Sequence, residues 1–279
     1  MSRGRSRLLR YMALYAILSL AAVFALIPLV WCLSTSLKAP SQALAFPPTW
    51  IPSSPTVNNY VDVIFGSNMP RYFLNSMITV FGTICLSLLA GSLAGYGTSR
   101  FPFHGRDAVM AFFLVTIMIP GIVTLVPVYM LTVKVGLQNT YVALILVYSA
   151  WQVPSVTWLM RGFFDSVPKE MEEAALIDGC TRFGAFFRVA VPLTQPGISA
   201  AAIIIFVWVW NDFLFGLTLT TTDRMRLVPV GLYNYVSAYG VEWTRLMAAV
   251  SLALLPVIVL FLILERRFIH GLTSGGVKS

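Results

Sequence analysis

The chain has 279 residues, of which 58% are hydrophobic and only 11% are charged, and its formal net charge is +8. Soluble domains carry about 25% charged residues, so this composition excludes an ordinary soluble globular protein. Lipid must cover the excess apolar surface, which indicates an all-α, polytopic membrane protein.

The first predicted transmembrane helix covers residues 11–33 and follows four arginines within the first ten residues. A cleaved signal peptide is the alternative interpretation, because small residues occur in this stretch. The apolar run is however about twice as long as a signal core, and Pro28 and Trp31 lie late in it. We therefore predict that this helix is retained.

A proline-rich polar connection, residues 34–71, separates the first two spans. Within it we predict one short amphipathic helix over residues 57–65. Its apolar face would be formed by Val57, Tyr60, Val61 and Ile64. The second span covers residues 72–98 and contains Gly91 and Gly95, whose small size predicts close packing between helices.

The third and fourth spans cover residues 108–133 and 140–160. Pro120 and Pro127 interrupt the third, and Pro154 lies in the fourth. A proline inside a span frees a backbone carbonyl that neighbouring helices or water must satisfy. Such spans suit a protein with an interior cavity, although plain proline kinks explain them equally well.

Residues 161–196, called the polar loop below, precede the fifth span at 197–219 and the sixth at 245–264. Six spans place both termini on the same side of the membrane. The segments on that side, the polar loop included, then hold 13 of the 19 lysines and arginines. Because basic residues concentrate on the cytoplasmic side, we expect both termini and the polar loop to be cytoplasmic.

The polar loop itself reads as helix, turn, helix. Ser166 is the expected N-cap of the first helix, Gly179 its left-handed stop, and Thr181 the cap of the second. Pro192 would end that second helix. Short helices with apolar side chains suit docking into a groove of a partner protein. A helix that lies on the membrane surface is the alternative.

The loop also carries a recognisable motif. Glu173-Ala174-Ala175, then Gly179 and, after nine residues, Val189, Val191 and Pro192, resemble the EAA loop of ABC importer permeases. Two valines replace the usual Ile and Leu. Residues 210–213 (Trp-Asn-Asp-Phe), residues 56–60 and the glycine-rich tail 271–278 are similar to the smaller permease of maltose-type carbohydrate importers.

The resemblance implies a single transmembrane domain, residues 1–279, in the plasma membrane, forming half of a sugar pathway. It implies four kinds of partner: a cytoplasmic ATPase dimer, a second permease, an extracytoplasmic substrate-binding protein and lipid. The residues expected to couple to the ATPase are Glu173, Ala174, Ala175, Leu176, Gly179 and Phe183. The tail residues Thr273, Ser274 and Gly275 are expected to contact it too.

No glycine-rich loop ending in Gly-Lys-Ser/Thr is present, so we expect a non-catalytic subunit. Three distant cysteines and two histidines predict no metal site, and no cofactor is expected.

Trp210, Asn211 and Asp212 are candidate lining residues of the pathway. Asp212 lies within a predicted span, where an acid must face protein or water. One interpretation is a polar group in the cavity, and the other is a structural hydrogen bond. An ion-coupled secondary carrier that uses Asp212 is the alternative function, and a membrane scaffold or receptor is a third. Nothing in the sequence names the sugar.

Overall fold

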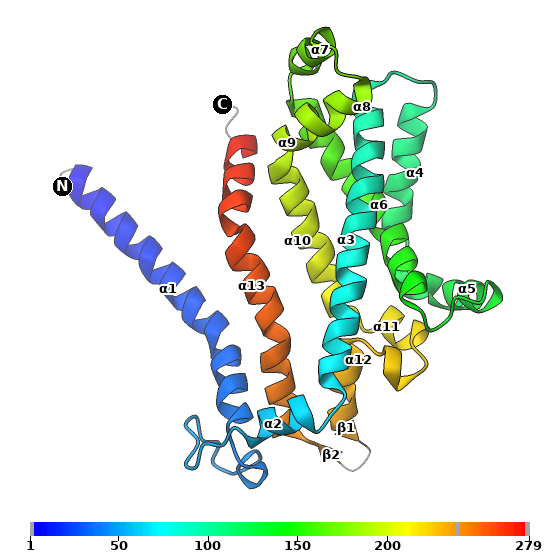
Figure 1. The fold of residues 1–279 in the computed structure, drawn as a ribbon. Coiled ribbons are helices and arrows are strands. Elements are labelled where there is room, and N and C mark those ends of the chain that lie inside the picture. Colours follow the sequence, from blue (N-terminus) through cyan, green and yellow to red (C-terminus); the bar gives the residue numbers. More distant parts are fainter. Residues whose placement is uncertain (1–2, 238–239, 277–279) are drawn as a thin grey trace. The chain divides into compact units, whose positions relative to one another are not determined.

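The computed structural model describes residues 3–237 and 240–276, with side chains for residues 10–237 and 240–263. Most of this is helical, and the strands in the described part are β1, Val236–Ser237, and β2, Gly240–Val241 (Figure 1). The prediction of an all-α chain is confirmed. The helices are α1 Arg3–Ser36, α2 Asn58–Phe65, α3 Met69–Arg100, α4 Arg106–Met118, α5 Gly121–Lys134, α6 Tyr141–Ser166, α7 Lys169–Ile177, α8 Arg182–Ala185, α9 Val191–Leu193, α10 Gln195–Asn211, α11 Leu214–Leu219, α12 Val228–Leu232 and α13 Trp243–Gly276.

Four helices in the described residues are long and apolar enough to cross a membrane: Arg10–Ser36, Met69–Arg100, Tyr141–Ser166 and Trp243–Ile263. Two further candidates are pairs of helices joined at a sharp bend. One pair, α4 and α5, bends by 98°, and the other, Arg182–Leu193 with Gln195–Asn211, bends by 76°. The count is six if each bent pair is one span, which agrees with the predicted number.

The chain packs as two compact units. One consists of Met1–Met69 with Leu232–Leu254, and the other of Pro70–Gly231 with Leu255–Ser279. The single transmembrane domain over residues 1–279 therefore stays a prediction. The two units are described separately below.

A buried lysine near the end of α1 organises the first unit. Lys38 Nζ donates to Thr49 O at 2.6 Å and lies 4.2 Å from the centre of the Trp31 ring. Trp31 meets Trp50 edge-on, with ring centres 5.0 Å apart. Because a buried ammonium needs acceptors or aromatic faces, these contacts fold the proline-rich connection back onto the end of α1.

Helix α2 forms where predicted, but its buried face is a different one. Asn59 and Val63 are buried, whereas Val57 and Val61 are exposed. The reason is polar: Asn59 Nδ2 donates to Ser36 O and Lys38 O, both at 2.8 Å, and so satisfies carbonyls where α1 ends. This contact, which no apolar pattern reveals, sets the rotation of α2.

The rest of the first unit is a hairpin and the start of α13. β1 and β2 pair antiparallel with Val236 opposite Val241. Arg245 of α13 forms a 2.8 Å ion pair with Asp62 of α2. These elements connect the end of α2 to the beginning of the last span.

Helices α3 and α6 form the centre of the second unit, and glycines allow their close approach. A Cβ at Gly91 would lie 2.6 Å from Val156 Cγ1, and one at Gly95 would lie 3.0 Å from Arg161 N. The prediction that these glycines serve packing is confirmed. Gly91 lies against Val156 and Gly95 against Arg161, so residue numbers rise together along the two helices. Helices α3 and α6 therefore run in the same direction.

The predicted third span, residues 108–133, is two helices. Helix α4 ends at Met118, and Pro120, in an extended conformation, begins α5. Pro127 lies inside α5 without ending it, so only one of the two prolines interrupts the span as predicted. Pro120 has no backbone N–H, but a residue at the start of a helix does not need one for an intrahelical hydrogen bond. Proline is therefore tolerated at the sharp bend between α4 and α5.

Candidate functional site

The polar loop begins later than predicted. Helix α6 continues to Ser166, whose hydroxyl donates to Phe163 O at 2.7 Å, so Ser166 ends one helix rather than capping the next. Pro168 explains the boundary, because the residue before a proline avoids the helical conformation. Val167 is accordingly extended, and α7 starts at Lys169 with Pro168 at its N-cap.

Gly179 makes the predicted turn. Its φ is +88°, a left-handed conformation that glycine adopts without a steric penalty. The amide of Cys180 bonds Ala175 O at 2.9 Å, and the amide of Gly179 bonds Leu176 O at 3.1 Å. These two bonds form a Schellman motif, which satisfies the last carbonyls of α7.

The second helix of the loop starts as predicted but does not end at Pro192. Thr181 Oγ1 accepts from Gly184 N at 3.1 Å and caps α8. A π-helical turn, Phe186–Ala190, follows, and Pro192 lies within α9. The actual bend comes at Thr194, where α10 turns away by 76°.

The buried side chain of Glu172 fixes α7 to the end of α3. Glu172 Oε1 accepts from Arg100 Nε at 2.8 Å, and Oε2 accepts from Tyr96 Oη at 2.6 Å. Arg100 also donates to Val167 O at 2.8 Å. Each group at this buried site therefore has a charged or polar partner, which a buried ion pair requires.

Sequence reasoning missed this role of Glu172. It lies beside Glu173 in an acidic first turn, and no local signal separates the two residues. The distinguishing fact is long-range, since Arg100 and Tyr96 are more than 70 residues away in the chain. Arg100, a cation at the end of the second predicted span, was the one sequence feature that pointed to a partner for Glu172.

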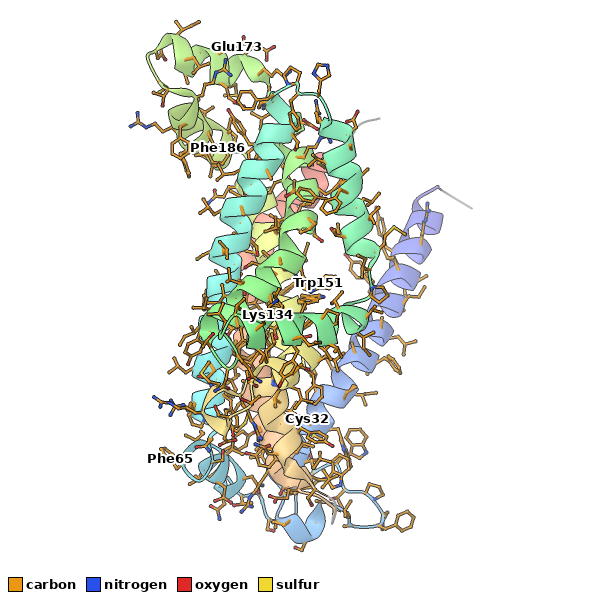
Figure 2. All side chains as sticks on the ribbon, turned by 90° about the vertical axis from the view of Figure 1, so that its right-hand side faces the viewer. Cys32, Phe65, Lys134, Trp151, Glu173 and Phe186 are labelled. Carbon is orange, nitrogen blue, oxygen red and sulfur yellow. The ribbon has the colours of Figure 1, made fainter. Side chains whose placement is uncertain are left out.

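The residues predicted to dock lie on the accessible side of the same loop. Glu173, Ala174, Leu176 and Phe183 are exposed, and Ala175 is half-buried. Ile177, which the prediction did not include, is 87% exposed, and Phe183 is 66% exposed. Helix α7 lies beyond the ends of α3, α4 and α6, and Glu173 is at that extremity of the second unit (Figures 1 and 2).

Phenylalanine rings pack between the exposed residues of the polar loop and the ends of α3 and α6. Phe186 is buried against Tyr96, with ring centres 4.8 Å apart, and against Phe164 at 6.0 Å. Phe183 meets Phe187 at 4.8 Å. A cavity of about 290 Å³ lies beside the contact of α7 with the end of α3; its lining includes Tyr96, Arg100, Lys169, Glu172, Glu173 and Arg182. The loop thus presents an apolar tip on a polar, anchored base.

A second feature is the break between α10 and α11 at Asp212. Asp212 Oδ2 accepts from Tyr148 Oη at 2.8 Å and from the amides of Phe215 and Gly216 at 3.0 and 3.1 Å. The carboxylate therefore caps the N-terminus of α11, where free amides and the helix dipole favour an anion. This geometry favours the structural interpretation of Asp212.

The other two candidate lining residues differ from each other. Trp210 is 4% exposed, stacks on Phe206 at 5.5 Å and meets Phe73 edge-on at 5.9 Å, so it packs within the unit. Asn211 is exposed and donates to Val207 O at 2.7 Å. Of the three, Asn211 is exposed, Asp212 is half-buried and Trp210 is buried.

The tail residues Thr273, Ser274 and Gly275 lie in α13, which continues to Gly276 instead of ending at Leu264. Their side chains fall outside the described part of the structure, and so does Lys278. Their contact with an ATPase stays a prediction. In the described residues, no group of three His, Cys, Asp or Glu side chains is placed to hold a metal ion.

Comparison with known proteins gives consistent matches along the chain. Residues 87–273 match the family model described as "Binding-protein-dependent transport system inner membrane component". The sulfoquinovosyl glycerol transport system permease protein SmoH of Agrobacterium fabrum is 34% identical over 260 residues, which are 93% of this chain and 91% of the relative. The trehalose/maltose transport system permease protein MalG of Thermococcus litoralis is 32% identical, covering 93% and 94% of the two chains.

Solved structures match the fold. A bacterial ABC transporter involved in the import of the acidic polysaccharide alginate superposes with a TM-score of 0.81 at 18% identity, covering 96% of this chain and 99% of that one. The MetNI methionine ABC transporter gives a TM-score of 0.56 at 19% identity and covers 73% of this chain and 94% of that one. At these identities the likeness concerns the fold alone.

Proposed function

Because this chain belongs to the family of binding-protein-dependent transport system inner membrane components, we propose that it is a permease subunit of an ATP-driven carbohydrate importer. It forms half of the translocation pathway, and a second, related permease forms the other half. Similar proteins named as permeases for sulfoquinovosyl glycerol, galactooligosaccharides and trehalose/maltose support a carbohydrate as substrate.

The observation that carries the proposal is the anchored tip of the polar loop. It combines exposed apolar side chains, led by Ile177 and Phe183, with a base held by the Arg100–Glu172 pair. A rigid, exposed apolar tip suits a groove on a partner subunit. We infer that one subunit of a cytoplasmic ATPase dimer binds here and that Glu173, Ala174, Ala175, Leu176 and Phe183 contact it.

The orientation follows from charge. The segments that share a side with the polar loop hold most of the basic residues, which favours a cytoplasmic loop and cytoplasmic termini. The opposite face, including the 220–228 segment, then meets the extracytoplasmic substrate-binding protein. Because the sequence has no glycine-rich loop ending in Gly-Lys-Ser/Thr, we assign ATP hydrolysis to the partner.

The ion-coupled carrier receives less support. It requires Asp212 to exchange a proton or bind a cation, yet the Asp212 carboxylate already accepts three hydrogen bonds within its own unit. Membership in the family also favours import driven by ATP.

Uptake by proteoliposomes tests the proposal. The chain is reconstituted with its ATPase, the second permease and the binding protein, and radiolabelled oligosaccharides are offered with ATP inside. We expect uptake that requires hydrolysable ATP and persists when an uncoupler removes the proton gradient. Uptake without the ATPase that collapses with the uncoupler would establish the carrier instead.

A further inference from the structure

The polar loop is one of two loops tied to the same helix. At its cytoplasmic end, α3 holds the loop through Tyr96 and Arg100, which both bond the buried Glu172 carboxylate. The same end of α3 makes a second contact, because Ser99 Oγ donates to Asp165 Oδ1 at 2.5 Å near the end of α6. Displacement of α7 relative to α3 would break charge-assisted hydrogen bonds in a buried site.

The other end of α3 holds the 220–228 segment in a similar manner. Asn75 is fully buried, and its Nδ2 donates to Arg224 O at 3.0 Å and to Arg226 O at 2.8 Å. Ser76 Oγ accepts from the Val228 amide at 2.9 Å. Tyr72 also donates to the Asp223 carboxylate. Side chains of the first turns of α3 therefore hold residues 223–228 of this segment, whereas Asn139 Oδ1 accepts from the amides of Thr221 and Thr222.

Between these ends α3 is continuous. It has 32 residues, a length of about 48 Å at 1.5 Å per residue. Among the four described helices that can cross a membrane alone, the other three contain an internal proline, namely Pro28, Pro154 and Pro256. Prolines weaken the hydrogen-bond ladder, so α3 lacks the weak point that each of the other three contains.

We propose that α3 is a rigid connector that carries displacement of the polar loop to the 220–228 segment on the opposite face. Glu172 with Arg100, and Asn75, are the positioning residues at its two ends. This proposal rests on the function given above. It goes beyond that function by naming the element through which ATP-driven movement reaches the face that meets the binding protein.

Distances between spin labels in the reconstituted complex test the connector. One label replaces Glu170 in the first turn of α7, outside the residues proposed to contact the ATPase, and the other replaces Arg224, both exposed, after Cys32, Cys85 and Cys180 are changed to serine. In the wild-type background we expect the 170–224 distance to be the same without nucleotide and with trapped ATP. The distance from 224 to a label on the second permease should change between these states.

Variants at the two ends give the decisive comparison. Asn75→Leu keeps the size of the side chain but removes its hydrogen bonds to the 220–228 segment, and Glu172→Gln removes the charge at the other end. In both variants we expect label 224 to lose its response to ATP while the ATPase still binds. Thr83→Val is the matched control, because the Thr83 hydroxyl bonds Thr79 O within α3 itself.

Each result decides between the alternatives. The proposal is wrong if the 170–224 distance changes with ATP in the wild-type background, or if label 224 responds to ATP normally in Asn75→Leu. Asn75 is remote from the ATPase, so this variant is informative even if Glu172→Gln prevents assembly. Failure of the wild-type chain to bind any ATPase would refute the proposed function itself, and the connector with it.

Discussion

Arg100 Nε donates a 2.8 Å hydrogen bond to Glu172 Oε1, and the exposure of the two side chains is only 7% and 9%. This ion pair joins the last residue of α3 to the first turn of α7. Glu173, the next residue along α7, is exposed and has no part in the pair. Two adjacent glutamates therefore have separable roles, one in holding the polar loop and one in contacting a partner.

Alanine at these two positions should give opposite results. Glu172→Ala leaves the Arg100 cation buried without its carboxylate, and removing one partner of a buried pair costs about 3–5 kcal/mol of stability. Glu173→Ala changes an exposed residue and should alter stability by no more than about 0.5 kcal/mol. Thermal unfolding of the purified chain measures both stability changes. We expect Glu173→Ala to weaken co-purification of the ATPase instead. Equal melting temperatures for the two variants would contradict the assigned roles.

The turn at Gly179 gives a second prediction. A Cβ there would meet no atom within 4 Å, so any penalty must come from the left-handed backbone and not from crowding. That conformation costs an L-residue about 1–2 kcal/mol, less for asparagine and more for a β-branched residue. We expect ATP-driven uptake to fall in the order glycine, Gly179→Asn, Gly179→Val.

Gly162 provides the control for this series. It too has open space around it, but it lies in α6 without a positive φ. Gly162→Ala should leave uptake unchanged and stabilise α6 by about 0.5–1 kcal/mol. Comparable loss of uptake in Gly162→Ala and Gly179→Val would argue against a special role for the turn.

Local signals account for what the sequence predicted well. Gly179 and Thr181 act through bonds to residues within a few positions, so their roles follow from residue type and spacing. Pro168 was also visible, but its effect on the preceding residue outweighs the capping tendency of Ser166. Element type was thus more predictable than element boundary.

Long-range polar contacts account for what was missed. Asn59 sets the rotation of α2 through carbonyls more than 20 residues away, and Glu172 finds its partner 72 residues away. Both side chains look solvent-exposed by type, and both are buried. Burial of a polar side chain depends on a partner brought by the fold, which hydrophobic periodicity does not encode.

Packing between α3 and α6 gives a third prediction. Valine at position 91 would bring its Cβ 2.6 Å from Val156 Cγ1, so either the Val156 side chain or the two helices must shift. Overpacking of this kind costs about 1–3 kcal/mol. Gly97→Val is the matched control, because it places the same residue in the same helix, where a Cβ meets nothing within 4 Å. We expect Gly91→Val to melt at a lower temperature than Gly97→Val, and equal melting would mean that the interface can relax.

Asp212 gives the prediction that separates the two transport mechanisms. Its Oδ2 accepts from Tyr148 and from two amides of α11, a capping role that an uncharged amide oxygen can also fill. Asparagine caps helices about as well as aspartate, whereas loss of a cap costs about 0.5–2 kcal/mol. Asp212→Asn should therefore retain uptake within about twofold, and Asp212→Leu should lose stability and uptake together.

Uptake is measured with ATP, with and without an uncoupler. A proton-coupled carrier would lose transport in Asp212→Asn despite an intact cap, because the amide cannot exchange a proton with the pathway.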